Sequence, residues 1–303
     1  MSETVYLRDV RQRPGFLTVW ERHRHRRAHW LVELFAESVS TLHVLMWIGT
    51  HFFCPGVGST AAFIIGTLSG QPGLGSVLQI GFAYAFGILL AITICSATSG
   101  GHFNPCVTIS FVVFRGFPPL KAVRYIVAQI FGGYIACLLI YAQYKDLINL
   151  VDEGLAAKGA LEAIQFTPNG TGGILALYTQ PGANLARTLL NEFVSDTILG
   201  LAIWACLDPT NFLVPPAAGP WIISFAYSVA IWGFSPPGLA ANAARDVGGR
   251  LAAMTVWGMK ASGGTYAALA ALTNIPAMLF AASLYEIFLT DSSRGSSFVL
   301  RVC

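Results

Sequence analysis

The stretch of residues 99–108, SGGHFNPCVT, constrains the fold of this chain more than any other, because it joins two apolar segments without a polar loop. The apolar run before it, residues 76–97, ends without a polar loop, and a short apolar segment, residues 107–114, follows it. The glycine pair permits a sharp turn, Asn104 can cap a new helix, and Pro105 fits the first helical position. The segment is too short to span a bilayer, and irregular backbone at membrane depth must be buried in protein or line a water-filled cavity. We therefore expect a re-entrant half-helix with the rest of the chain packed around it.

A second stretch, residues 238–246, repeats this design in the other half of the chain and reads GLAANAARD. In both stretches a glycine stands four residues before an asparagine: Gly100 before Asn104, and Gly238 before Asn242. Two turns of one design indicate that the chain contains two related halves.

The composition favours a lipid bilayer as the solvent of this chain. Of its 303 residues, 54% are hydrophobic and 11% are charged, whereas a soluble domain has about 25% charged residues. The six cysteines are scattered, without the paired spacing of a metal site or a disulfide framework. We therefore expect an integral membrane protein without a metal or another cofactor.

The charge of the chain is concentrated at its amino terminus. Seven arginines precede the first apolar run: Arg8, Arg11, Arg13, Arg22, Arg24, Arg26 and Arg27. Basic segments beside a membrane span are retained on the cytoplasmic side, where they contact anionic lipid. We therefore expect a cytoplasmic amino terminus that touches the lipid bilayer, and no nucleic-acid partner.

Six apolar runs approach the ~20 residues that a membrane-spanning helix needs. They cover residues 30–53, 76–97, 119–144, 184–207, 217–234 and 265–289. Three spans in each half is an odd number, so the halves must be inverted and the two turns must enter from opposite faces. The sequence therefore predicts an all-α membrane protein with six transmembrane helices, two re-entrant half-helices and two inverted repeats.

These spans divide the chain into a basic segment (1–29), a membrane domain (30–289) and a polar tail (290–303), with both termini cytoplasmic. Repeat one covers about 30–144 and repeat two about 184–289. The segment 145–183 between them is more acidic than basic and is interpreted as an external loop, either a vestibule or lid or a disordered linker. It contains the sequon Asn169-Gly170-Thr171, which makes Asn169 a candidate for glycosylation.

The two stretches resemble the paired Asn-Pro-Ala boxes of the major intrinsic proteins, the aquaporin family, and 242–246 resembles the glycerol-conducting branch. The first box reads Asn104-Pro105-Cys106 and the second Asn242-Ala243-Ala244, so each differs from the family triplet at one residue. The resemblance implies that 30–289 is a channel domain of a homotetramer. It also implies passive passage of glycerol, water and other small neutral solutes.

The resemblance also implies a selectivity filter, located by counting from the boxes. Its positions fall on Tyr84, Ala230, Leu239 and Arg245. The glycerol-conducting branch usually places two aromatic residues there, whereas this chain has one, so we expect a wide and partly apolar opening. His102 and Asp246 occupy further positions that are typical of the family; His102 either lines the pore or is a satisfied buried histidine.

Helix dipoles explain why such a site would exclude ions. Two half-helices that meet end to end each place roughly half a positive charge at the centre, which repels cations. The amides of Asn104 and Asn242 are expected to point into the lumen and to donate to passing hydroxyl or water oxygens. Glu37 and Glu192, at equivalent places in the two repeats, are interpreted as acceptors for the exposed amides of the turns, with a proton relay as the alternative.

Cys106 is the cysteine with a specific expected position, because it is the third residue of the first box. We expect its thiol beside or just behind the pore wall, within reach of a small mercurial. The alternative is a thiol that is turned into the packing behind the half-helix.

Two other classes of protein were weighed. A secondary transporter also uses inverted repeats and broken helices, and it is the alternative to a channel. An intramembrane enzyme is not expected, because the chain lacks Gly-x-Ser-x-Gly and His-Glu-x-x-His motifs and its histidines lack metal spacing.

Overall fold

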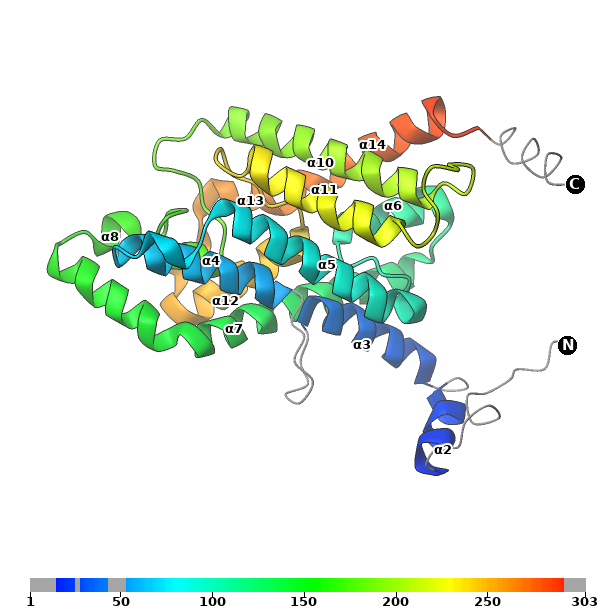
Figure 1. The fold of residues 1–303 in the computed structure, drawn as a ribbon, viewed down its shortest axis with the longest axis horizontal. Helices are drawn as coiled ribbons and strands as arrows, with labels where there is room; N and C mark the ends of the chain where they lie inside the picture. The colour runs from blue at the N-terminus through cyan, green and yellow to red at the C-terminus, as the bar shows by residue number, and fades with distance from the viewer. Residues whose placement is uncertain (1–14, 25–27, 43–52, 292–303) are drawn as a thin grey trace, which may run out of the picture.

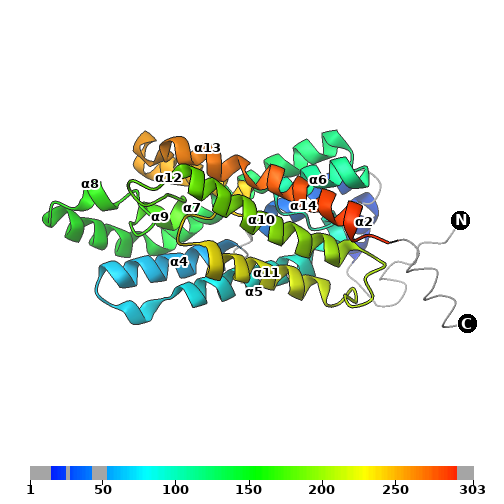
Figure 2. The same ribbon diagram turned by 90° about the horizontal axis from the view of Figure 1, so that it is seen from above.

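In the computed structural model, residues 15–24, 28–42 and 53–291 are described, and they form helices and turns without a strand (Figures 1 and 2). Most of the predicted basic segment (1–29) and of the tail (290–303) lies outside the described residues. Within the described part, four helical stretches are long and apolar enough to cross a membrane: Pro72–Ser99, Pro119–Ala157, Leu185–Leu207 and Gly264–Phe288.

The first half of the chain contains α2 (Gly15–His23), α3 (His29–Leu42), α4 (Phe53–Leu68), α5 (Val77–Ser99), α6 (Pro105–Arg115) and α7 (Pro119–Ala157). The short helices α8 (Leu161–Ile164) and α9 (Gly172–Leu175) lie between the halves. The second half contains α10 (Leu185–Leu207), α11 (Gly219–Phe234), α12 (Ala243–Trp257), α13 (Gly264–Leu272) and α14 (Asn274–Phe288).

The two halves pack their helices in the same pattern. α3 packs against α5 and α7, and α10 correspondingly packs against α11 and α14. α5 and α11 lie side by side across the centre, while α6 contacts α14 and α12 contacts α7. In both ribbon views α6 and α12 lie on opposite sides of the centre of the molecule (Figures 1 and 2). The prediction of an all-α fold with two inverted repeats and two half-helices is therefore confirmed.

The expected boundaries of two spans were wrong. Of the first span, predicted over 30–53, residues 43–52 lie outside the described part; α3 covers its beginning, and α4 extends from Phe53 to Leu68. α4 buries Val57, Ala61 and Ile64. The third span, predicted over 119–144, continues to Ala157.

The extension of α7 is explained by its buried residues. Ile148, Val151 and Leu155 recur at helical spacing and join a hydrophobic cluster with Ile64 of α4. At 1.5 Å per residue α7 is about 58 Å long, well beyond the ~30 Å core of a bilayer. The first part of the expected external loop (145–183) is therefore helical.

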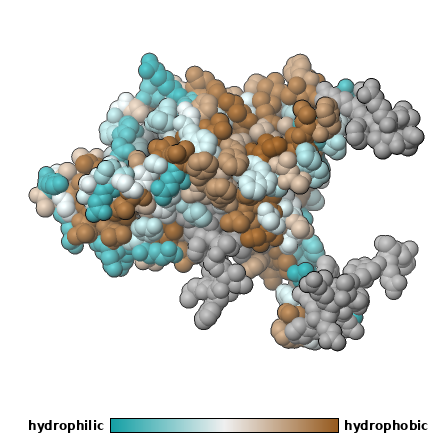
Figure 3. All heavy atoms as spheres, viewed as in Figure 1, coloured by the Kyte–Doolittle hydropathy of each residue, from teal (hydrophilic) through white to brown (hydrophobic). Residues whose placement is uncertain are grey.

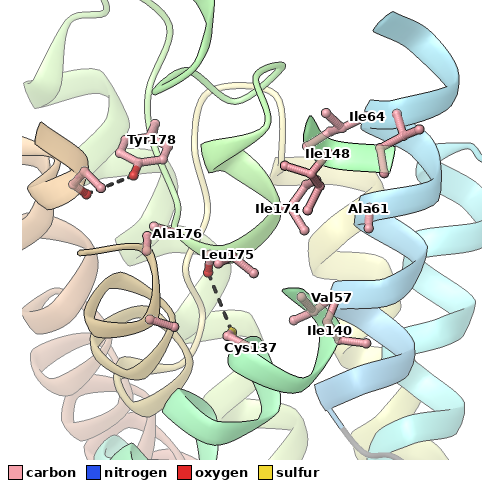
Figure 4. Packing of buried hydrophobic residues seen from close by; sticks show 14 of the residues in the cluster. Val57, Ala61, Ile64, Cys137, Ile140, Ile148, Ile174, Leu175, Ala176 and Tyr178 are labelled. Carbon is pink, nitrogen blue, oxygen red and sulfur yellow. Dashed lines mark hydrogen bonds between the residues drawn. The ribbon is translucent and has the colours of Figure 1, made fainter. Parts of the chain in front are cut away.

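The remainder of that segment is packed and does not form a disordered linker. Ile174, Leu175 and Ala176 are fully buried among α4, α7 and α12. Figure 4 shows Ile174 and Leu175 pointing into this cluster, with Sγ of Cys137 directed at the Leu175 carbonyl, 3.8 Å away. The segment thus has a fixed position against the second half-helix.

The surface of the molecule matches a membrane protein. Large apolar side chains are exposed along the long helices, including Phe86, Ile94, Val127, Phe131 and Leu190. In Figure 3 hydrophobic residues spread over the middle of the visible face, while hydrophilic residues gather towards the end that holds α8.

The close contact between α7 and α12 involves two glycines. A Cβ on Gly248 of α12 would lie 2.6 Å from the backbone nitrogen of Tyr134 and 2.7 Å from the carbonyl oxygen of Ile130, both on α7. A Cβ on Gly133 would lie 2.8 Å from the carbonyl oxygen of Ala244. The backbones of α7 and α12 can approach this closely only because neither glycine carries a side chain.

Gly248→Ala should therefore destabilise the protein by at least the ~1–3 kcal/mol typical of overpacking, since the obstructing atoms are backbone. The measurement is the thermal unfolding midpoint of the purified protein in detergent. Gly154→Ala is the matched control, because no atom lies within 4 Å of its added Cβ on α7. Equal midpoints for the two variants would contradict this packing.

Candidate functional site

The two predicted turns meet at the centre of the fold, and each asparagine caps the half-helix that follows it. Oδ1 of Asn104 accepts from the amide of Cys106 (3.2 Å), and Oδ1 of Asn242 accepts from the amides of Ala244 (2.9 Å) and Arg245 (3.2 Å). These bonds satisfy amides at the first turn of α6 and of α12. Both amino termini therefore begin at the centre, as the sequence predicted.

The asparagine side chains also join the two repeats. Nδ2 of Asn104 donates to the carbonyl of Ala241 (2.9 Å), and Nδ2 of Asn242 donates to the carbonyl of Phe103 (3.0 Å). Phe103 and Ala241 have φ angles of 53° and 55°, the left-handed region that residues with a side chain rarely adopt. The reciprocal bonds hold these two strained residues in place.

Two buried glutamates accept from the remaining amides of the turns. Glu37 of α3 accepts from the amides of His102 (3.1 Å) and Phe103 (3.0 Å). Glu192 of α10 accepts from the amides of Ala240 (2.7 Å) and Ala241 (2.7 Å). The structure thus places both glutamates where the sequence analysis expected acceptors.

Arg245 lies on the first turn of α12, almost completely buried, with its guanidinium held from two sides. Nη1 donates to the carbonyl of Leu175 (2.7 Å) and Nε donates to the hydroxyl of Tyr84 (3.3 Å). The segment around α9 therefore fixes the guanidinium, and Arg245 in turn supplies a donor to Tyr84.

Asp246 contacts a second arginine and lies outside the lining of the central cavity. Its carboxylate pairs with Arg250 at 2.5 Å, and Arg250 also donates to the carbonyl of Leu177 (3.0 Å). Tyr178 also ties the segment after α9 to the residues that follow α12, because its hydroxyl donates to the carbonyl of Ala261 (2.8 Å). Burial raises the pKa of Tyr178 to about 12, so its hydroxyl stays protonated and keeps donating at neutral pH.

A cavity of about 430 Å³ runs past these groups. Its polar lining residues include Tyr84, His102, Asn242 and Arg245. Its apolar lining includes Leu239 and several isoleucines and valines, among them Ile88, Ile92, Val107, Ile203, Ile223 and Ile231. Asn169 and Gln180 line it in the segment between the repeats. The cavity thus offers few donors in a largely apolar path.

Two of the expected lining residues lie elsewhere. Ala230 is buried, and α11 lines the cavity with Ile223, Tyr227 and Ile231 instead. Asn104 is fully buried, and its Nδ2 donates to the Tyr227 hydroxyl (3.3 Å) as well as to the other turn. Both of its amide hydrogens are thereby used, so the expected pair of lumen amides is reduced to Asn242.

His102 lines the cavity and is also a buried histidine. Its ring packs against the rings of Phe111 and Phe117. Nδ1 lies 3.2 Å from the hydroxyl of Thr108, so the histidine has a polar partner. Its position is fixed by this packing.

The expected position of the Cys106 thiol beside the pore was wrong. Cys106 is 1% exposed and packs in a hydrophobic cluster with Leu199, Trp204 and Met278, away from the cavity lining. The alternative, a thiol turned into the packing behind the half-helix, is the arrangement that the structure has. Val107, the next residue, lines the cavity instead.

The sequence analysis missed Asp196, one helical turn after Glu192 on α10. Asp196 is 1% exposed, and no donor in the part of the chain that the structure describes reaches either of its carboxyl oxygens. Its carboxyl group lies within hydrogen-bond reach of the Glu192 carboxyl. The spacing Glu-x-x-x-Asp within an apolar run is the signal that could have revealed this pair, since residues four apart share a helix face.

Among the described residues, no group of three histidines, cysteines, aspartates or glutamates is arranged to hold a metal ion. The arrangement is instead one of donors and a fixed positive charge around a cavity. Such a site can bind and orient neutral polar molecules.

Comparisons with known proteins agree with this geometry. The family model described as "Major intrinsic protein" matches residues 24–261. The chain is 56% identical over 298 residues to "Aquaporin-3" of Laccaria bicolor, covering 97% of this chain and 88% of that protein. It is 32% identical over 174 residues to "Aquaporin-3" of Milnesium tardigradum, covering 57% of this chain and 51% of that protein.

A solved structure, "X-ray structure of the aquaglyceroporin from Plasmodium falciparum", matches the fold. The TM-score is 0.68 at 18% identity, with 86% of this chain and 97% of that chain covered. The chain is thus an integral membrane protein of a channel family. It belongs to the major intrinsic protein family, the aquaporins.

The position of Cys106 predicts its response to a mercurial. Because the thiol is buried away from the cavity, mercuric chloride should affect water flux in Cys106→Ala and in the wild type to the same extent. Absence of inhibition in both proteins also fits this expectation. The measurement is osmotic shrinkage of proteoliposomes with and without the mercurial. Inhibition in the wild type that disappears in Cys106→Ala would contradict the assignment.

Proposed function

We propose that this protein is a passive channel for glycerol, other small neutral solutes and water. The observation that carries the proposal is the cavity whose lining combines the polar side chains of Arg245 and Asn242 with apolar residues such as Leu239 and Ile231. Glycerol has hydroxyl groups and C–H groups along one short chain. A path that offers both hydrogen-bond donors and hydrocarbon therefore suits it.

The same site supports the exclusion of ions and protons. The amino termini of α6 and α12 both begin at the centre, where each contributes roughly half a positive charge. Arg245 adds a full charge, held by the Leu175 carbonyl. A cation that enters would meet repulsion and would lose its hydration shell in a largely apolar path.

We also propose that both termini are cytoplasmic. Lys121 bonds Glu33 near the start of α3 (2.7 Å), and Arg115 bonds Glu286 near the end of α14 (3.0 Å). The beginning of α3 and the end of α14 lie at the same end of the molecule (Figure 1). Basic residues at that end support the cytoplasmic side.

Asn169 belongs to the opposite, external side in this orientation. It is exposed and lines the cavity, and we keep it as the candidate for glycosylation. The Thr171 hydroxyl of the same sequon is buried and bonds Asp152 (2.6 Å). A glycan would therefore have to be attached before this segment folds.

The family relationship further supports a homotetramer in the lipid bilayer. The large apolar side chains exposed on α5, α7 and α10 give each subunit surface for both lipid and neighbouring copies.

A secondary transporter is the alternative, and Asp196 is the observation that bears on it. A carboxyl group at membrane depth is typical of ion-coupled transport. Asp196 does not line the cavity, however, and its neighbour Glu192 is occupied by the second turn. The arrangement therefore supports the channel.

The proposal predicts that proteoliposomes with the purified protein shrink under an impermeant osmolyte and re-swell with glycerol, both faster than protein-free vesicles. Stopped-flow light scattering measures both rates. Glycerol flux that rises linearly with its gradient supports a channel, whereas saturable flux that depends on an ion gradient supports the transporter. Rates at the lipid background for a folded protein would contradict both.

Arg245→Ala should raise the permeability of larger polyols and of ions several-fold, because it removes the charge and side-chain volume from the cavity. Solute permeability in proteoliposomes is the measurement. Arg250→Ala is the matched control. Arg250 also donates to a carbonyl of the segment around α9, that of Leu177, but it does not line the cavity. The same permeability profile in both variants would count against the role of Arg245.

A further inference from the structure

The position of the Tyr84 ring is determined by a glycine on a neighbouring helix. A Cβ placed on Gly56 of α4 would lie 2.4 Å from Cζ of Tyr84 and 2.5 Å from each of its Cε atoms. Real Cβ atoms do not approach other atoms this closely. The hydroxyl end of the phenol therefore occupies the space that any side chain at position 56 would fill.

This ring is part of the polar wall of the cavity. Its hydroxyl accepts from Nε of Arg245 at 3.3 Å, and Arg245 is itself fixed by the Leu175 carbonyl at 2.7 Å. The recess at Gly56 lets the ring lie back against α4 while it keeps this bond. The free width of the cavity beside Arg245 thus depends on how far the ring can withdraw.

The α4 backbone has no room to give way on its other side. Val57 and Ala61 are fully buried, and they pack with Ile140 of α7 (Figure 4). The Tyr84 ring, in contrast, borders the cavity, and the obstructing atoms are at the far end of its side chain. A larger residue at position 56 would therefore push the ring into the cavity and leave the helix in place.

We propose that Gly56 is a specificity-determining residue: its missing side chain forms the recess that receives the Tyr84 ring and sets the width of the path beside Arg245. The inference rests on the proposed function and adds a limit on the width of the solutes that pass, which is that of a small polyol. A glycine inside a helix is destabilising relative to alanine, and the recess accounts for its presence here.

Gly58, one half-turn further along α4, provides the matched control. A Cβ there would meet its nearest neighbour, Cδ1 of Ile140, at 3.4 Å, an ordinary contact. Gly58→Ala therefore adds the same methyl group to the same helix without touching Tyr84.

The experiment compares glycerol and water permeability in proteoliposomes for the wild type, Gly56→Ala, Gly58→Ala, Tyr84→Ala and the double variant Gly56→Ala/Tyr84→Ala. Gly56→Ala should lower the ratio of glycerol to water permeability several-fold, and Gly58→Ala should leave it within about twofold, since its contact is ordinary. In the Tyr84→Ala background the Gly56→Ala change should have no further effect. An unchanged ratio in Gly56→Ala, or an equal decrease with and without the Tyr84 ring, would overturn the inference.

An experimental structure of Gly56→Ala separates this inference from the proposed function. The ring should be displaced from α4 towards the cavity, whichever solute the wild type conducts, and an unmoved ring with a shifted α4 would overturn the inference. A wild type that conducts no glycerol would contradict the proposed function alone.

Discussion

The structure depends on acceptors for the backbone amides of two turns that lie at the depth of the membrane. Water cannot solvate these amides there, and an unbonded amide would cost several kcal/mol. Glu37 and Glu192 accept from the residues before each box, and the two asparagines accept from the third residue of each box. Because the asparagines also donate across to the opposite turn, the two repeats share one hydrogen-bonded junction.

The rest of the site follows from that junction. Fixing the turns fixes the starts of α6 and α12, and therefore the place where their positive ends meet. It also fixes Arg245 on the first turn of α12, which the carbonyl of Leu175 then holds in one orientation. The packed segment around α9 is thus as much a part of the site as the half-helices are, and the central cavity passes between them.

The sequence predicted the fold class, the two turns and the placement of both glutamates, because each rests on local chemistry: glycine before asparagine, and a carboxylate at membrane depth. It failed where tertiary packing decided the outcome. The extension of α7 depends on Ile148 and Val151 meeting Ile64 of α4, a contact between segments far apart in the sequence. The side of α6 on which Cys106 lies depends on how that helix is rotated. The hydrogen bond from Asn104 to Tyr227 depends on the position of α11. Spacing from a motif specifies neither of these.

We propose that two opposed helix termini and a fixed guanidinium let neutral solutes pass while they exclude protons. Proton flux measured with a pH-sensitive dye inside proteoliposomes, under a pH gradient and an imposed membrane potential, tests this most directly when glycerol flux is recorded in the same vesicles. We expect proton flux equal to that of protein-free vesicles together with glycerol flux well above it. Proton flux that rises with the amount of protein in the vesicles would contradict this proposal.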